Sequence, residues 1–266
     1  MALKTMTEHE YRTHPALNQS TFKDFITKTP KQFAHQQKPE VKAKKKITDA
    51  MILGSLTDCL YLEPHLLHRE FVEIKTVTND KGKTSPAPKT ANNSPDTQRQ
   101  LRELEAKGLR GYLANHKEEA EKIVNALPQA ILPAPEQRQI VGIGTICGVP
   151  CKGKADWIDD DGYLWDLKTT AAFSEFYYKA KAPNSRSYLG YDIQAAWYYT
   201  LFKELKPKGF RWLVVESKEP YDYKIYEASN ETLTDAQYRI MDALEEYKQC
   251  LHENEWPGYD KTPEVI

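Results

Sequence analysis

The sequence predicts an α/β protein with one mixed sheet that has helices on both sides. Apolar residues recur at helical spacing through much of the first half, alternate as in strands after residue 136, and return to helical spacing near the end. A chain of 266 residues can form one large domain. We expect a single domain in which residues 1–135 are mostly helical, residues 136–230 hold the sheet and its partner helix, and residues 231–266 form a C-terminal helix and tail.

The composition is typical of a soluble globular protein without a membrane partner. Hydrophobic residues make up 40% and charged residues 28%, and the net charge of −1 provides no general attraction to nucleic acid. No apolar run reaches the length of a transmembrane helix, and the first residues lack the apolar core of a signal peptide. We therefore expect a cytoplasmic protein. Its four cysteines form no CxxC pair, which disfavours a zinc or iron–sulfur cluster.

Residues 18–36 predict a short helix that Ser20 caps and whose apolar face carries two phenylalanines. Pro30 should break this helix, because proline removes a backbone donor. A basic run with four lysines follows at 42–46. Such a run is usually a solvated surface, although it could also contact a nucleic-acid backbone.

Residues 47–62 predict a buried helix in which one residue is unusual. The segment is rich in Leu, Ile and Met, and Gly54 with Ser55 permits close packing against a neighbour. Asp58 lies in these apolar surroundings, where a lone charge is costly to bury. A metal ion or a buried Lys or Arg would compensate its charge.

Residues 75–98 predict a long mobile loop, because they are rich in Lys, Thr, Asn, Ser and Pro. Loops of this length inside a domain are usually functional or disordered. Asp96 is the expected cap of a helical stretch that continues to Leu113. Another helix is expected over residues 115–127.

A β-hairpin is the centre of the predicted sheet, and a strand over 137–147 precedes it. The arms of the hairpin are 152–159 and 163–170. The three-residue loop between them ends in Gly162, which favours the left-handed conformation that closes such hairpins. The face that we expect in the core carries three apolar side chains: Trp157, Trp165 and Leu167.

The hairpin register places two carboxylates opposite each other. Asp156 faces Asp166 with Cβ atoms about 5 Å apart, where like charges are destabilising. A divalent cation such as Mg²⁺, which prefers carboxylate oxygens, would compensate them. Lys168 lies on the same face and could stabilise charge on a phosphate. Glu136, just before the preceding strand, is a third candidate carboxylate. A surface hairpin of solvated charges is the alternative.

The remaining elements surround this hairpin. We expect helices and strands over five ranges: 174–180, 186–205, 209–216, 223–227 and 232–251. In the second of these helices, Tyr191, Gln194 and Tyr198 form a polar stripe beside an apolar one. The stripe indicates that the helix borders a polar cleft, although structural hydrogen bonds would explain it as well.

Taken in order, these residues resemble the PD-(D/E)xK nuclease superfamily, in its RecB-like branch with a QxxxY helix motif. Within that branch the chain is similar to the C-terminal nuclease domain of the exonuclease VIII (RecE) family. Four stretches carry the resemblance: residues 20–30 (STFKDFITKTP), LGSLTDCLYLEP, GKADWID…WDLKTT and QAAWYY. The resemblance implies a restriction-endonuclease-like core.

The resemblance also assigns roles to single residues. Asp156 and Asp166 match the metal-binding carboxylates, and Lys168 matches the catalytic lysine. Leu167 would offer its backbone carbonyl to the metal. Asp58 stands where relatives typically have His, and it remains a workable ligand for Mg²⁺ or Mn²⁺. The QxxxY motif corresponds to Gln194 and Tyr198.

The activity that the resemblance implies is Mg²⁺-dependent exodeoxyribonuclease action on linear double-stranded DNA. It further implies 5′→3′ polarity, 3′ single-stranded overhangs for recombination by strand annealing, and a ring-like homo-oligomer such as a tetramer. A single-strand annealing protein would be the partner, in a bacterial or phage-infected cell. We expect DNA contacts from four residues: Tyr177, Arg186, Tyr188 and Tyr191.

Two other functions stay open on the same residues. A structure-specific or site-specific endonuclease could use the same fold. A non-catalytic DNA-binding scaffold could retain it as well. Packing in the core or between subunits would explain the four expected DNA-contact residues equally well.

Overall fold

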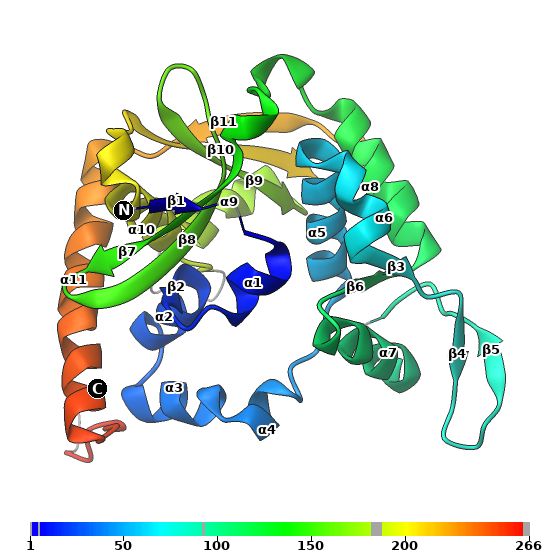
Figure 1. The fold of residues 1–266 in the computed structure, drawn as a ribbon, viewed down its shortest axis with the longest axis horizontal. Helices are drawn as coiled ribbons and strands as arrows, with labels where there is room; N and C mark the ends of the chain where they lie inside the picture. The colour runs from blue at the N-terminus through cyan, green and yellow to red at the C-terminus, as the bar shows by residue number, and fades with distance from the viewer. Residues whose placement is uncertain (1, 5, 92–93, 182–187, 263–266) are drawn as a thin grey trace.

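A computed structural model of the chain describes residues 2–4, 6–91, 94–181 and 188–262. Its centre is a mixed sheet in the order β1-β7-β8-β9-β10-β11, with β2 paired to β8 (Figure 1). The pairs β9–β10 and β2–β8 are parallel and the other pairs antiparallel. The strands are β1 (Ala2–Lys4), β2 (Leu17–Asn18), β7 (Arg138–Ile146), β8 (Val149–Ile158), β9 (Tyr163–Thr170), β10 (Gly209–Glu216) and β11 (Tyr223–Glu227).

Helices cover both faces of this sheet, as the sequence predicts. On one face lie α2 (Gln19–Ile26), α3 (Pro30–Gln37), α10 (Tyr191–Leu201) and α11 (Asn230–Glu253), and on the other lie α5 (Asp49–Leu62) and α8 (Ala114–Ala126). Alternate residues of β10 show the two layers. Trp212 and Val214 belong to the core under α10 and α11, whereas Leu213 and Val215 pack in the core that includes Tyr61 of α5. The mixed α/β sheet with helices on both faces is therefore confirmed.

The start of α2 differs from the prediction. Asn18 caps the helix, since its Oδ1 accepts from the backbone N–H of Thr21 at 2.7 Å. Ser20 lies inside the helix and donates to Asn18. Pro30 begins α3 rather than only ending α2, because Thr29 caps the new helix and proline fits its first turn.

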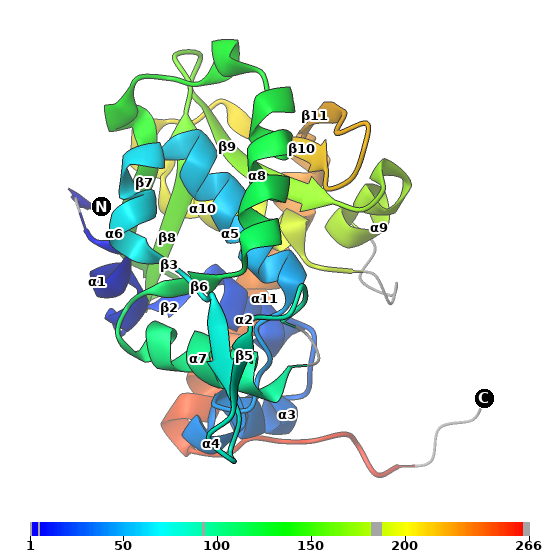
Figure 2. The same cartoon turned by 90° about the vertical axis from the view of Figure 1, so that its right-hand side faces the viewer.

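The segment 75–98 is not one continuous loop. It contains the hairpin β4 (Thr76–Thr78) and β5 (Thr84–Pro86), which projects from the body, and the start of α7 (Pro95–Ala106) (Figure 2). Asn79 closes the turn by accepting from two backbone N–H groups, and Val77 is buried. Ser94, and not Asp96, caps α7. The hydrogen bonds that Asn79 accepts therefore order a hairpin turn in a segment whose polar composition predicts a loop.

Short elements complete the fold. They are α1 (Glu8–Thr13), α4 (Pro39–Lys42), α6 (Leu67–Glu70), β3 (Phe71–Glu73), β6 (Arg110–Tyr112) and α9 (Phe176–Lys181). Strands β3 and β6 pair in parallel beside α7. Among the described residues, no helix has both the length and the hydropathy that crossing a membrane requires.

The QxxxY helix is shorter than predicted at its start. Residues 182–187 lie outside the described residues of the chain, and α10 begins at Tyr191. Gly190 precedes it with φ 65°, a left-handed conformation that suits glycine. Gly153 of β8 permits close approach of this helix, since a Cβ there would lie 2.9 Å from Leu201 and 3.0 Å from Tyr198.

Candidate active site

The tip of the central hairpin forms as its sequence predicts. Gly162 has φ 87°, and its N–H donates to the carbonyl of Asp159 at 2.9 Å. The first two ladder pairs, Trp157↔Trp165 and Ile158↔Leu164, keep the predicted register. Trp157, Trp165 and Leu167 are all buried together on one face, which confirms the expected core face.

Beyond these two pairs the strands separate, and this corrects the predicted pairing of Asp156 with Asp166. The other half of β8 pairs instead with β2 at Cys151 and Lys152. Asp156 occupies the resulting fork, where its Oδ2 accepts the backbone N–H of Leu167 at 2.6 Å. Asp156 and Asp166 therefore do not form a ladder pair.

Asp166 is held by the two side chains that the resemblance assigned to the site. Gln194 of α10 donates from Nε2 to Asp166 Oδ1 at 2.7 Å. The Lys168 ammonium makes a close ion pair with Asp166 Oδ2 and lies over the ring of Tyr191, 5.2 Å from its centroid. Asp166 is only 4% exposed, so these contacts fix a buried carboxylate.

Helix α5 brings Asp58 to the same cavity. A Cβ on Gly54 would lie 3.8 Å from Thr169 Oγ1, so the helix lies close against β9 as the small residues predict. Asp58, Asp156, Leu167 and Lys168 all line a cavity of about 1760 Å³. Pockets for small molecules usually measure ~300–1,000 Å³. The larger volume suits a polymeric substrate.

Burial changes the acid–base behaviour of this cluster. It raises the pKa of Asp58 to about 7, with Lys168 opposing the rise and Asp166 adding to it. It also raises the pKa of Asp156, together with Asp166 and Asp58, and the pKa of Asp166 itself. Burial lowers the pKa of Lys168, but Asp166, Tyr191 and Asp156 together raise it above its ordinary value, so the ammonium stays charged.

The donor set suits a hard divalent cation in its chemistry. Asp58 and Asp156 line one cavity, and Asp166 borders it next to Leu167 and Lys168. All three carboxylates have raised pKa values, which a cation would lower. Asp166 Oδ2 is buried without a hydrogen bond from any described residue, with the Lys168 ammonium beside it. The described His, Cys, Asp and Glu side chains nevertheless form no ready-made metal group of three or more. Binding would therefore require rearrangement around Lys168.

The other predicted site residues divide into four groups. Tyr198 and Tyr191 line the cavity, and so does Glu136, which lies exposed in a turn before β7 rather than among the buried carboxylates. Tyr188 binds Asp192 and Arg239, which is a structural role. Tyr177 is 62% exposed and outside the cavity lining. Arg186 lies outside the described residues.

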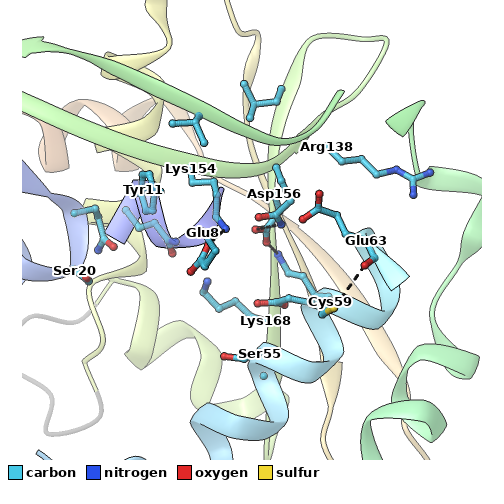
Figure 3. A pocket seen from close by; sticks show the side chains of 18 of the residues that line it. Glu8, Tyr11, Ser20, Ser55, Cys59, Glu63, Arg138, Lys154, Asp156 and Lys168 are labelled. Carbon is cyan, nitrogen blue, oxygen red and sulfur yellow. Dashed lines mark hydrogen bonds and ion pairs between the residues drawn. The ribbon is translucent and has the colours of Figure 1, made fainter. Parts of the chain in front are cut away.

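Two residues of this cavity escaped the sequence analysis. The first is Glu8 of α1, which forms a 2.6 Å ion pair with Lys154 of β8, and both point into the cavity beside Lys168 (Figure 3). Burial raises the pKa of Glu8, yet Lys154 and Arg12 lower it to about 2. The partners are 146 positions apart in sequence, so only the fold reveals them.

Gln139 is the second of these residues. It has φ 49° at the second position of β7, and its Nε2 donates to Asp156 Oδ1 over 3.4 Å. A left-handed residue other than glycine is uncommon in a strand. The unusual backbone turns this side chain toward Asp156, which is thereby contacted on both oxygens.

Comparison with known proteins agrees with this geometry. The sequence model of the family described as "PDDEXK-like domain of unknown function (DUF3799)" matches residues 18–265. This match places the chain in the PD-(D/E)xK superfamily, as its motifs predict. It does not test the finer resemblance to the RecE branch. No curated protein matches the sequence.

Two solved structures are similar to the chain. One, from Eubacterium rectale, is described as a "Putative exonuclease" and has a TM-score of 0.61 and 14% sequence identity. The alignment covers 99% of this chain and 92% of that one, so it supports the fold. The other, SSO0001, has 11% identity and a TM-score of 0.32 over 89% of this chain and 94% of that one, which is too low to support an argument.

Proposed function

Because this chain belongs to the family of PDDEXK-like domains of unknown function, we propose that it is a metal-dependent nuclease that cleaves DNA. One observation carries the proposal. Asp58, Asp156, Asp166 and Lys168 come from one helix and two strands and line or border a single cavity. A scaffold would have no need to bury such mutually repelling carboxylates, because each buried charge costs stability.

The residues have distinct tasks in this proposal. Asp58, Asp156, Asp166 and the carbonyl of Leu167 would hold Mg²⁺ or Mn²⁺. When bound, the metal would supply positive charge to the phosphate and acidify water. Gln194 keeps Asp166 in place through its 2.7 Å hydrogen bond. Lys168 stays charged, and on leaving Asp166 it would stabilise the negative charge that develops at phosphorus.

The finer proposal is an exonuclease that acts on ends of linear double-stranded DNA. The resemblance to the RecE family supports 5′→3′ polarity, 3′ overhangs for recombination by strand annealing, and a ring-like homo-oligomer with an annealing protein as partner. The name given to the fold relative from Eubacterium rectale favours the same activity. A prophage or phage context inside the bacterial cell would fit this role.

The experiment is cleavage of linear duplex DNA labelled separately at its 5′ and 3′ ends, with Mg²⁺ and with EDTA as control. We expect metal-dependent early loss of the 5′ label while closed-circular DNA stays intact. Cleavage of circular DNA would favour the endonuclease alternative. Tight DNA binding without cleavage in Mg²⁺ or Mn²⁺ would favour the non-catalytic scaffold.

The variant Lys168→Ala tests the site within that assay. We expect cleavage to fall by about a hundredfold or more, as for loss of a charge-stabilising group, with DNA binding retained. Lys203→Ala, at an exposed lysine outside the cavity lining, is the matched control and should cleave normally. Cleavage by Lys168→Ala at more than a few per cent of the wild-type rate would contradict the role of Lys168.

A further inference from the structure

Lys23 of α2 is a cation that pairs with none of the described residues. Its side chain is half-buried, and it has no hydrogen bond or ion pair with a described residue. Lys28, five residues later, contrasts with it, because its ammonium contacts Asp24 at 2.7 Å and Gln36 at 2.6 Å. A buried ammonium that no protein group neutralises is unfavourable unless an anion binds to it.

The stem of Lys23 passes directly over the start of α10. A Cβ on Gly190 would lie 2.6 Å from Lys23 Cδ, so only glycine leaves room for this lysine. The next residue, Tyr191, lies beneath the ammonium of Lys168. Lys23 is therefore adjacent to the catalytic cavity. Gly190 offers no side-chain cap to α10, so the positive end of the helix dipole adds to the local charge.

Other lysines extend this positive region to the surface. Burial lowers the pKa of Lys23; Asp24 opposes this effect, and Lys168, Lys45 and Lys28 add to it. Asp24 is already paired with Lys28. Lys45 belongs to the exposed basic run and has no ion pair with a described residue. Lys168 and Lys45 are thus each close enough to repel Lys23; Lys168 lines the cavity, Lys23 is half-buried and Lys45 is exposed.

We propose that Lys23 binds an internal phosphodiester group of the DNA strand in the active site, and that Lys45 contacts the same strand farther out. This inference rests on the proposed nuclease function and assigns the path of the strand across α2. Lys23 would contact a phosphate and no base, so its contribution is independent of sequence.

The test is the salt dependence of DNA binding, measured by fluorescence anisotropy in EDTA so that no cleavage occurs. The probe is a linear duplex with either a 5′-phosphate or a 5′-hydroxyl. We expect Lys23→Gln to weaken binding to both duplexes about three- to tenfold and to reduce the slope of log K against log salt by about one unit. The control Lys28→Gln should keep the wild-type slope, because its charge is already neutralised by Asp24.

The outcomes separate this inference from the proposed function. If wild type binds and cleaves DNA but Lys23→Gln keeps the full slope, the Lys23 site is wrong and the nuclease proposal stands. A loss confined to the 5′-phosphorylated duplex would overturn the assignment to an internal phosphate. Absence of any DNA binding by wild type would instead overturn the proposed function and this inference with it.

A second variant distinguishes the loss of a DNA contact from misfolding. Lys23→Met keeps the length of the side chain and removes the unpaired charge, so we expect an unchanged or higher urea midpoint together with the weaker DNA binding. A lower midpoint would show that Lys23 stabilises the fold, which would contradict an ammonium that lacks a protein partner.

Discussion

The two faces of the β8–β9 pair are built from neighbouring residues, but one stabilises the fold and the other destabilises it. On one face Trp157 and Trp165 stack with centroids 5.1 Å apart and planes 13° apart, and Tyr61 meets Trp157 edge-on. On the other face, Asp166 is buried and Asp156 is partly buried, and the two like charges repel each other. The aromatic face gains free energy from packing, whereas the acidic face is tolerable only because the first face supplies stability.

The largest loss of stability is expected when the aromatic face is removed. Trp157 is fully buried, and Trp157→Ala should lower the free energy of unfolding by about 3–5 kcal/mol. Urea denaturation measures this loss, with Tyr238→Ala at an exposed residue as the control. The molecules that remain folded should still cleave DNA. A loss of less than about 1 kcal/mol would mean that this face does not support the hairpin.

The next effect concerns Glu8, which neutralises Lys154 on the acidic face. Its pKa in the folded protein is about 2, below the ordinary 4.5. The ion pair therefore stabilises the fold fully above about pH 4.5, and this stabilisation is lost as the pH falls toward 2.

Between about pH 5 and about pH 3, wild type should lose roughly 2 kcal/mol more than Glu8→Gln loses. Urea unfolding at about pH 5 and about pH 3 compares the two proteins. The exposed Glu40→Gln is the control and should follow wild type. Equal acid sensitivity of wild type and Glu8→Gln would rule out the stabilising pair.

At Asp58 we expect stability to depend on pH in the opposite direction. Its folded pKa of about 7 exceeds the ordinary 3.8, so the folded state binds a proton that the unfolded state releases. Stability should therefore fall as the pH rises from about 4 to about 7. Asp58→Asn should be more stable than wild type by roughly 4 kcal/mol at about pH 8, with little gain at about pH 4.

Cleavage should decrease in Asp58→Asn while stability increases, because the amide is a poorer ligand for a hard cation than the carboxylate. Thermal unfolding at the two pH values, paired with the end-label assay, measures both quantities. A variant that is less stable at about pH 8 would show that Asp58 contributes a favourable interaction there.

The smallest expected changes in stability and cleavage concern the left-handed backbone of Gln139. Gln139→Gly removes the side chain that contacts Asp156 and relieves the left-handed conformation of a non-glycine residue. We expect the free energy of unfolding to rise by about 1 kcal/mol and cleavage to fall by about tenfold. Gln139→Ala should lose cleavage without the gain in stability. Full activity in Gln139→Gly would remove any positioning role for this residue.

The predictable regions of the molecule are those decided by nearby residues. The loop that ends in Gly162, the two ladder pairs beside it, and the stripe of Gln194 and Tyr198 all follow from short spacings, and the structure contains them. The range of α5 is predicted within two residues of its start. Each of these depends on turn chemistry or on periodicity within one element.

The wrong predictions arise where two local signals compete or where partners are distant. Asn18 and Ser20 are both good caps, and the first is used. The separation of β8 from β9 depends on β2, more than a hundred residues earlier in the chain. Glu8 likewise reaches Lys154 only in the folded protein. Such long-range pairings leave no periodic signal in the sequence.

The hydrogen bond between the Leu167 N–H and Asp156 gives the site a natural spectroscopic reporter. The electronic surroundings of that amide depend on the charge of a single carboxylate. In a ¹⁵N-labelled protein, the chemical shift of Leu167 would follow protonation of Asp156 and the arrival of any cation beside it. The amide signal of Leu167 can therefore report the charge state of Asp156 in the unsubstituted protein, without a substrate.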